Sequence, residues 1–121
     1  MAQSVRVQRV YDDAPTVGKA VLVDHVWPRG IKKGKLSADL WMREIAPSDA
    51  LRGWFGHRPE RWEEFRQRYR AELDQPERRE LLNQLVEIAR LGPLTLLYGA
   101  RDRDRNQATV IREVVEERLA T

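Results

Sequence analysis

Two short apolar segments constrain the fold of this chain more than any other feature of its sequence. The first covers residues 20–23 within KAVLVDHVW, and the second covers residues 94–98 within PLTLLYGA. Apolar runs of only four or five residues without alternation are typical of strands that are buried on both faces. Strands of this kind occur in parallel sheets that lie between other layers, so the two segments predict an α/β fold.

The remaining segments predict one further strand and several helices. Residues 4–12 alternate like a half-buried strand, whose direction stays open because the connection over residues 12–18 is short for a parallel crossover. Helices are predicted over about 48–56, from residue 59 through at least 73, and over about 76–91 and 107–119. This order of elements predicts a single domain with a small, mostly parallel sheet of about three or more strands and several packed helices.

Aromatic residues mark two helical segments. Ser37 is a good N-cap, and Leu36 and Trp41 are spaced like a hydrophobic staple, so a further helix is predicted from residue 37 to Pro47. In the segment that begins at residue 59, large side chains recur at intervals of three or four. This stripe resembles a cofactor box, but its spacing is better explained as core. It consists of Trp62, Phe65, Tyr69 and Leu73.

The overall composition excludes several classes of protein. The 121 residues suit one domain, contain no apolar run as long as the roughly 18 residues of a membrane span, and do not begin like a secretory signal. Without cysteine, the chain forms no disulfide, thiolate metal site or cysteine nucleophile. We therefore expect a cytoplasmic protein with no membrane contact. The 22 basic and 19 acidic residues are too evenly balanced to indicate nucleic-acid binding by themselves.

The loop after the first apolar run, WPRGIKKGK, has the composition of an anion site. Arg29 can hold a phosphate or carboxylate through two hydrogen bonds, and Gly30 allows a close backbone approach. Trp27 can stack on a ring, and Lys32, with two neighbouring lysines, adds long-range attraction. The alternative is a solvated turn whose tryptophan fills the core and whose lysines keep the surface soluble.

The ends of the predicted strands define where a site would lie. Ligands of open parallel sheets bind outside the carboxyl ends of the strands. If the two apolar strands are parallel neighbours, the loops DHVWPRGIKK and GARDRDRN lie side by side, and Tyr11 joins them if the first strand is also parallel. Asn106 is a natural N-cap for the last helix, whose terminus attracts anions. Tyr98 is expected in the core, with its hydroxyl reaching this rim.

Three residues are candidates for proton transfer. Asp24 ends a strand and is either an acid or base, or an ion-pair partner of Arg29, or a cap for loop amides. Asp102 belongs to a loop of alternating Asp and Arg that could neutralise itself. His57 could be a general base or could cap the preceding helix. The only other histidine, His25, has no second ligand at a metal-like spacing, so neither a metal nor a cofactor is expected.

Four stretches are specific enough to resemble a known family. They are VLVDHVWPRG, LWMREIAPSDALRGWFGH, RWEEFRQRYRAEL and LTLLYGARDRDRNQA. In this order and spacing they resemble the bacterial domain of unknown function 488 family, in its short YeaO-like branch, over roughly residues 5–119. The resemblance implies no biochemical activity, because none is established for the family.

The chain departs from the family pattern at several positions. His25 and Val26 stand where the family usually has Arg and Leu, and Arg58 stands where an Asp often follows the histidine of Trp-Phe-Gly-His. Arg105 and Gln107 flank Asn106 where the usual pattern is His-Asn or His-Asn-His. Longer relatives carry cysteine in the last strand and its loop, so their thiol or metal chemistry is not implied for this chain.

These observations favour a site for a small phosphorylated ligand, such as a nucleotide, with or without catalysis. The alternatives are a protein-interaction module in which tryptophans mark the partner surface, and then a nucleic-acid-binding protein that uses the 29–35 loop. Two tryptophan-bearing helices could also form the interface of a homo-oligomer.

Overall fold

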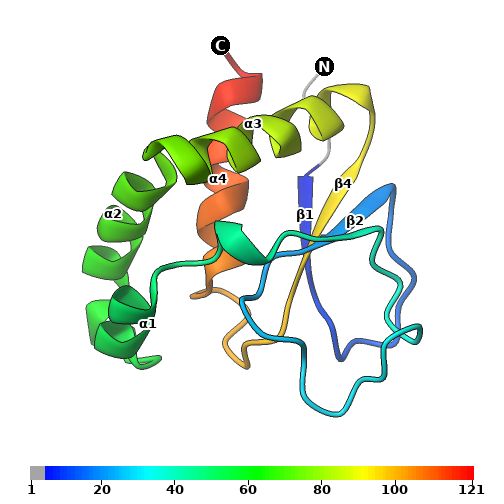
Figure 1. Ribbon diagram of the computed structural model, residues 1–121, viewed down its shortest axis with the longest axis horizontal. Coiled ribbons are helices and arrows are strands. Elements are labelled where there is room, and N and C mark those ends of the chain that lie inside the picture. The colour runs from blue at the N-terminus through cyan, green and yellow to red at the C-terminus, as the bar shows by residue number, and fades with distance from the viewer. Residues whose placement is uncertain (1–4) are drawn as a thin grey trace.

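The computed structural model describes residues 5–121 and contains a four-stranded parallel sheet (Figure 1). The strands lie in the order β1-β4-β2-β3. Their bounds are Val5–Arg9 for β1, Lys19–Leu22 for β2, Leu40–Trp41 for β3 and Leu94–Tyr98 for β4. The two apolar segments are the adjacent central strands, so the predicted α/β fold is confirmed.

The first strand, whose direction was open, runs parallel to β4 with Val5 beside Leu94 and Arg9 beside Tyr98. Because β4 lies between β1 and β2, the connection over residues 10–18 is not a helical crossover. It returns as a loop that begins with a turn, in which the Asp12 amide donates to the Arg9 carbonyl at 3.0 Å, and nine residues can span up to roughly 30 Å, enough to recross a short strand. The Thr95 hydroxyl holds this return by donating to the Val17 carbonyl at 2.7 Å.

The two faces of the sheet are covered differently. Helices pack on one face, to the left of the sheet in Figure 1, and loop residues cover the other. The helices are α1 (Asp49–Phe55), α2 (Trp62–Leu73), α3 (Pro76–Leu91) and α4 (Gln107–Leu119), with short 3-10 turns η1 (Arg43–Ile45) and η2 (Pro59–Arg61). The loop-covered face centres on Val10, Leu22 and Leu97, which Trp27 and Trp41 contact. No helix within residues 5–121 is both long enough and apolar enough to cross a bilayer.

The helix predicted from residue 37 to Pro47 is wrong. This segment instead forms β3 and the η1 turn, because it adds to the open edge of β2. The amide of Met42 donates to Leu22, and the Asp39 side chain accepts from the Ala20 amide, each at 2.8 Å. The Trp41 indole packs edge-to-face on Trp27 with ring centroids 5.3 Å apart. Strand pairing and aromatic packing outweigh the local capping signal.

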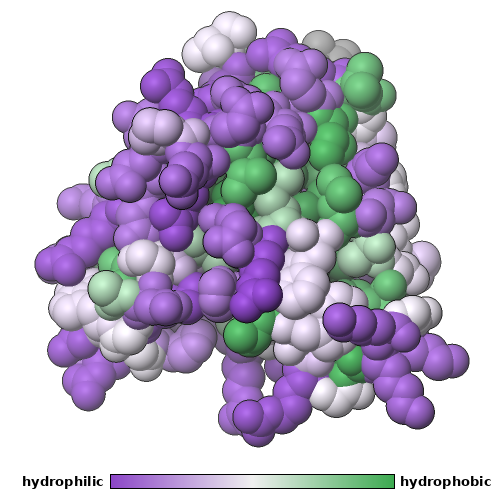
Figure 2. All heavy atoms as spheres, in the orientation of Figure 1, coloured by the Kyte–Doolittle hydropathy of each residue, from purple (hydrophilic) through white to green (hydrophobic). Residues whose placement is uncertain are grey.

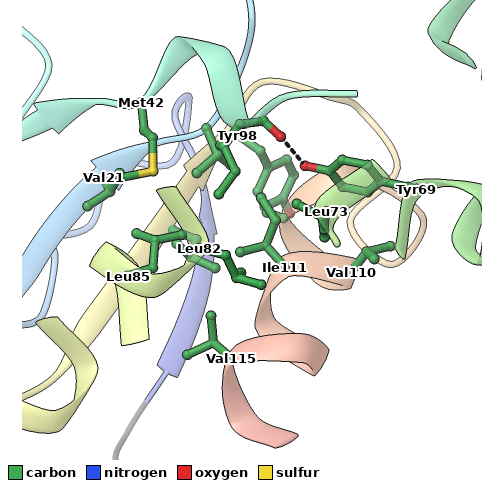
Figure 3. Close-up of a cluster of buried hydrophobic side chains, with 14 of the residues drawn as sticks. Val21, Met42, Tyr69, Leu73, Leu82, Leu85, Tyr98, Val110, Ile111 and Val115 are labelled. Atoms are coloured by element: carbon green, nitrogen blue, oxygen red, sulfur yellow. Dashed lines mark hydrogen bonds between the residues drawn. The ribbon is translucent and has the colours of Figure 1, made fainter. Parts of the chain in front are cut away.

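The aromatic stripe of α2 belongs to the core, as its spacing predicted. Phe65, Tyr69 and Leu73 are buried among residues of the sheet and of α3 and α4 (Figure 3). The Tyr69 hydroxyl donates to the Ile45 carbonyl at 2.7 Å, so the one polar atom of this ring is satisfied where it is buried. Ser48 also caps α1 as predicted, by accepting from the Leu51 amide at 3.2 Å.

Candidate functional site

A cavity of about 480 Å³ lies at the carboxyl ends of β1, β2 and β4. The loops that follow these strands form one side, and the start of α4, α1 and one residue of α2 form the other. The lining residues are Tyr11, Asp24, His25, Val26, Trp27, Pro28, Arg29, Ala46, Pro47, Arg52, Phe55, His57, Phe65, Gly99, Ala100, Arg105, Asn106 and Gln107. The loops DHVWPRGIKK and GARDRDRN therefore meet here, as the strand-end rule predicted.

Asp24 is the carboxylate of this cavity. One of its oxygens accepts from the Gly99 amide at 2.8 Å, and the other accepts from the side-chain amide of Gln107. Burial raises the pKa of the Asp24 carboxyl from 3.8 to about 6, although both hydrogen bonds favour the charged form. Of the two structural roles considered, the cap for a loop amide is the one the geometry shows, whereas Arg29 is not among its hydrogen-bond partners.

At Gly99 the chain passes very close to the Asp24 carboxylate. A Cβ built on Gly99 would lie 2.9 Å from the outer carboxylate oxygen of Asp24, closer than real Cβ contacts occur. A side chain here would push against the oxygen that accepts from the Gly99 amide, so Asp24 or the loop would have to shift. Gly99 was not predicted from the sequence as a site residue, although its position directly after a buried strand could have identified it.

Three arginines line the cavity. Arg29 is exposed, and its guanidinium makes no hydrogen bond or ion pair within residues 5–121. Arg52 donates to the Pro47 carbonyl at 2.5 Å and also pairs with Asp49, whereas Arg105 pairs with Asp102 at 3.3 Å. Arg29 was predicted from its loop. Arg52 was missed, because it comes from a helix that only the folded chain brings to the strand ends.

The aromatic candidates near the cavity differ in how accessible they are. Tyr11 lines the cavity, and its hydroxyl holds the cationic loop in place by donating to the Arg29 carbonyl at 2.8 Å. Trp27 is half-buried and donates to the Ile31 carbonyl at 2.5 Å, so it braces its own loop. Gly30 and Lys32 line a neighbouring open depression instead of this cavity.

Tyr98 and Asp102 lie outside the lining of this cavity, whereas His57 lies at its edge. Tyr98 is 2% exposed and belongs to the core (Figure 3), so its ring is not available for stacking, and burial raises the pKa of its hydroxyl. Asp102 is not in the lining. It braces its loop by accepting from the amides of Asp104 and Arg105, each at 3.0 Å, and these bonds lower the pKa of its carboxyl. His57 is exposed on the rim, at a positive φ of 56°.

Asn106 caps α4 as predicted and joins the helix to the loop. Its side-chain oxygen accepts from the Thr109 amide at 3.1 Å, and its side-chain nitrogen donates to the Asp102 carbonyl at 2.9 Å. At 2% exposure, neither group can exchange these partners for water without movement. The cap therefore also holds the arginine-bearing loop at the cavity.

Replacing Asn106 with alanine should lower the free energy of unfolding by about 2 kcal/mol, because it removes an N-cap and leaves the Asp102 carbonyl without its donor. Asn106→Ser is the control, since a serine hydroxyl can still accept as an N-cap and only the bond to the Asp102 carbonyl is lost, so it should lower the free energy of unfolding by about half as much. Urea unfolding at pH 7 measures both. Equal stability of wild type and Asn106→Ala would contradict a structural role for this cap.

The exposed large apolar side chains of residues 5–121 come from separate segments of the chain, at Tyr11, Val17, Val26, Leu40 and Leu91. On the face in Figure 2, hydrophilic side chains cover most of the helical side, and apolar ones show in the centre and at the upper right. Among the described residues, the most exposed large apolar side chains are Leu91 at 90% and Val26 at 66%. They lie at opposite ends of the sheet, because Leu91 precedes β4 and Val26 follows β2.

The chain is similar to known proteins over nearly its whole length. A family model described as the inactive DUF488-N3 subclade matches residues 4–121. The uncharacterized protein YeaO of Escherichia coli K12 is 42% identical over 111 residues, which cover 91% of this chain and 95% of that protein. The uncharacterized proteins Mb3100c of Mycobacterium bovis and Rv3073c of Mycobacterium tuberculosis H37Rv are each 38% identical over 115 residues, 94% of this chain and 95% of theirs. No solved structure matches the chain. Together with the motifs quoted above, these similarities show that the chain belongs to the DUF488 family.

Proposed function

We propose that this chain binds a small phosphorylated or similar organic anion in the strand-end cavity and holds it without chemical turnover. The observation that carries the proposal is the set of three arginines, Arg29, Arg52 and Arg105, around one cavity of about 480 Å³. A guanidinium holds phosphate or carboxylate oxygens through paired hydrogen bonds, and the start of α4 adds the positive end of a helix dipole beside them.

The size and walls of the cavity suit an organic ligand better than a bare ion. Small-molecule sites usually measure about 300–1,000 Å³ and combine apolar walls with a few polar groups. Here Phe55, Phe65 and Trp27 supply apolar wall, and the arginines with Asp24 supply the polar groups. A mononucleotide or a sugar phosphate has the corresponding combination of a charged group and a ring.

Binding without turnover is supported by the family description and by the residues of the site. The matching subclade is described as inactive. In this chain, Arg105 and Gln107 flank Asn106 where the family usually has histidine, and Arg58 follows His57 where an Asp is common. The side-chain amide of Gln107 donates a hydrogen bond to Asp24. The one carboxylate of the cavity that could transfer a proton therefore has an uncharged partner.

A thermal-shift panel of nucleoside monophosphates, sugar phosphates and sulfate at fixed salt would test this proposal. A ligand at about a hundred times its Kd should stabilise the fold by about 2.7 kcal/mol, which raises Tm by roughly 8–15 °C for a chain of this length. The shift should disappear in Arg29→Ala. It should persist in Arg90→Ala, because Arg90 lies on α3 outside the cavity. A panel without any shift in wild type would overturn the proposal.

A further inference from the structure

We propose that the cavity selects organic anions that also carry an N–H or O–H donor, and that the Asp24 carboxylate is the acceptor for this donor. The inference rests on the proposed anion site and adds the class of ligand to it. It follows from one feature of the cavity: a single carboxylate lies among three arginines and is held by two uncharged donors.

Asp24 has hydrogen-bonding capacity left toward the cavity. An ionised carboxylate offers about four acceptor positions, and the Gly99 amide and the Gln107 side chain occupy one on each oxygen. The carboxylate is fixed in direction by these two bonds, and it lines the cavity. A donor on a bound ligand would therefore meet a preoriented acceptor, without the cost of ordering a mobile side chain.

The same carboxylate opposes a ligand that lacks a donor. Asp24 is the only acid among the described residues that line the cavity, so a bare dianion drawn in by the arginines meets one like charge. A donor on the ligand changes this contact from repulsion to a charge-assisted hydrogen bond. Asp24 thus discriminates between two classes of anion that the arginines alone would accept equally.

The groups that face Asp24 are mostly cationic or neutral. They come from every element around the cavity, and they must be the same in any two proteins whose pH profiles are compared. They are Tyr11 after β1, His25 and Arg29 after β2, Arg52 in α1, His57 after α1, Tyr69 in α2 and Arg105 before α4. The informative quantity is therefore the difference between wild type and a variant altered only at Asp24.

The two ligand classes give opposite pH dependences. Burial raises the pKa of Asp24 to about 6, so its charge changes within an accessible pH range. An anion without a donor favours protonated Asp24, and its affinity rises as the pH falls through this range. An anion with a donor favours the ionised form, and its affinity rises with pH.

The experiment compares 3- and 4-aminobenzenesulfonate with 4-methylbenzenesulfonate and with inorganic sulfate by calorimetric titration at pH 5 and 7.5. The sulfonates keep one negative charge throughout, and an uncharged amino group is nearly the size of a methyl group. We expect at least one amino compound to bind wild type about tenfold more tightly than the methyl compound at pH 7.5, and this preference to shrink at pH 5.

Two variants separate the roles of the neighbouring residues. Asp24→Asn should reduce the preference to about threefold or less, abolish its pH dependence, and tighten binding of sulfate and of the methyl compound. Gln107→Ala keeps the carboxylate and removes a bond that stabilises its charged form, so the preference should persist with its midpoint at higher pH.

Each alternative outcome has a distinct meaning. If wild type binds the amino and methyl compounds equally at pH 7.5, or if Asp24→Asn keeps the full preference, the selection by Asp24 is overturned and the anion site stands. If neither sulfate nor any sulfonate binds wild type at either pH, the anion site is overturned and the inference with it.

Discussion

Replacing Gly18 with alanine should destabilise the fold by about 4 kcal/mol or more, a large part of the 5–15 kcal/mol that typically stabilises a small domain. Gly18 has a φ of +71°, and a Cβ at this position would lie 2.1 Å from the Pro93 carbonyl oxygen. The Lys19 amide donates to that same oxygen at 3.0 Å. The Pro93 carbonyl therefore cannot move away from residue 18 without losing the hydrogen bond that joins the start of β2 to the residue before β4. Steric overlap with rigid backbone and the positive φ both add to the cost.

Two other glycines provide matched controls. Gly34 has a φ of +95° with nothing within 4 Å of an added Cβ, so Gly34→Ala should show only the backbone cost, about 1 kcal/mol. Gly53 lies in α1 with open space around it, so Gly53→Ala should stabilise by up to about 1 kcal/mol. Urea unfolding of the three variants measures the series. If Gly18→Ala lowers the free energy of unfolding no more than Gly34→Ala does, the close approach to Pro93 adds nothing to the destabilisation.

The central part of the fold could be predicted because its signals are local and agree with its environment. The continuous apolar runs of β2 and β4 and the caps of α1 and α4 appear in the structure where the sequence placed them. The direction of β1 could not be predicted, since it depends on β4, which pairs with it from about ninety residues further along the chain. The segment from residue 37 to Pro47 has a capping signal for a helix, but the unpaired edge of β2 and the Trp27 ring are partners that only the folded sheet supplies.

The residues of the candidate site also divide into those that local sequence predicts and those that only the packed fold brings to the cavity. Asp24, Arg29, Tyr11 and Asn106 were predicted because each stands next to a strand end or a helix start, and parallel strands bring such positions to one edge. Arg52 could not be found by this rule, since it depends on how α1 packs beside the sheet. Tyr98 also follows its prediction, because its ring is buried in the core and its hydroxyl interacts with the Arg103 side chain of the loop that follows β4.

Asp24→Asn should stabilise the protein at neutral pH and have little effect in acid. The folded state raises the pKa of this carboxyl from 3.8 to about 6, so it disfavours the charged form relative to the unfolded chain. Between about pH 4 and 6 the folded state therefore holds more protons than the unfolded state, and wild-type stability falls as the pH rises through this window. Asparagine carries no charge in either state, and its side-chain oxygen can still accept from the Gly99 amide.

The size of the effect follows from the same values. The difference between 3.8 and about 6 corresponds to at most about 3 kcal/mol above pH 7, and the opening of the cavity to water reduces this to about 2 kcal/mol. The gain from Asp24→Asn should thus grow from near zero at pH 4 to about 2 kcal/mol at pH 8. Urea titrations of both proteins at one-unit intervals of pH measure it.

Asp102→Asn is a control of opposite sign. Hydrogen bonds from the Asp104 and Arg105 amides lower the pKa of the Asp102 carboxyl, so its charged form stabilises the folded state above its ordinary pKa. This variant should be less stable than wild type at pH 7, and the difference should fade as the pH drops below about 4. If Asp24→Asn instead lowers stability at pH 8 as Asp102→Asn does, the ionised Asp24 carboxylate is favoured by the fold. Its two hydrogen bonds then outweigh its burial, and Asp24 would carry its charge at the floor of the cavity throughout the physiological range.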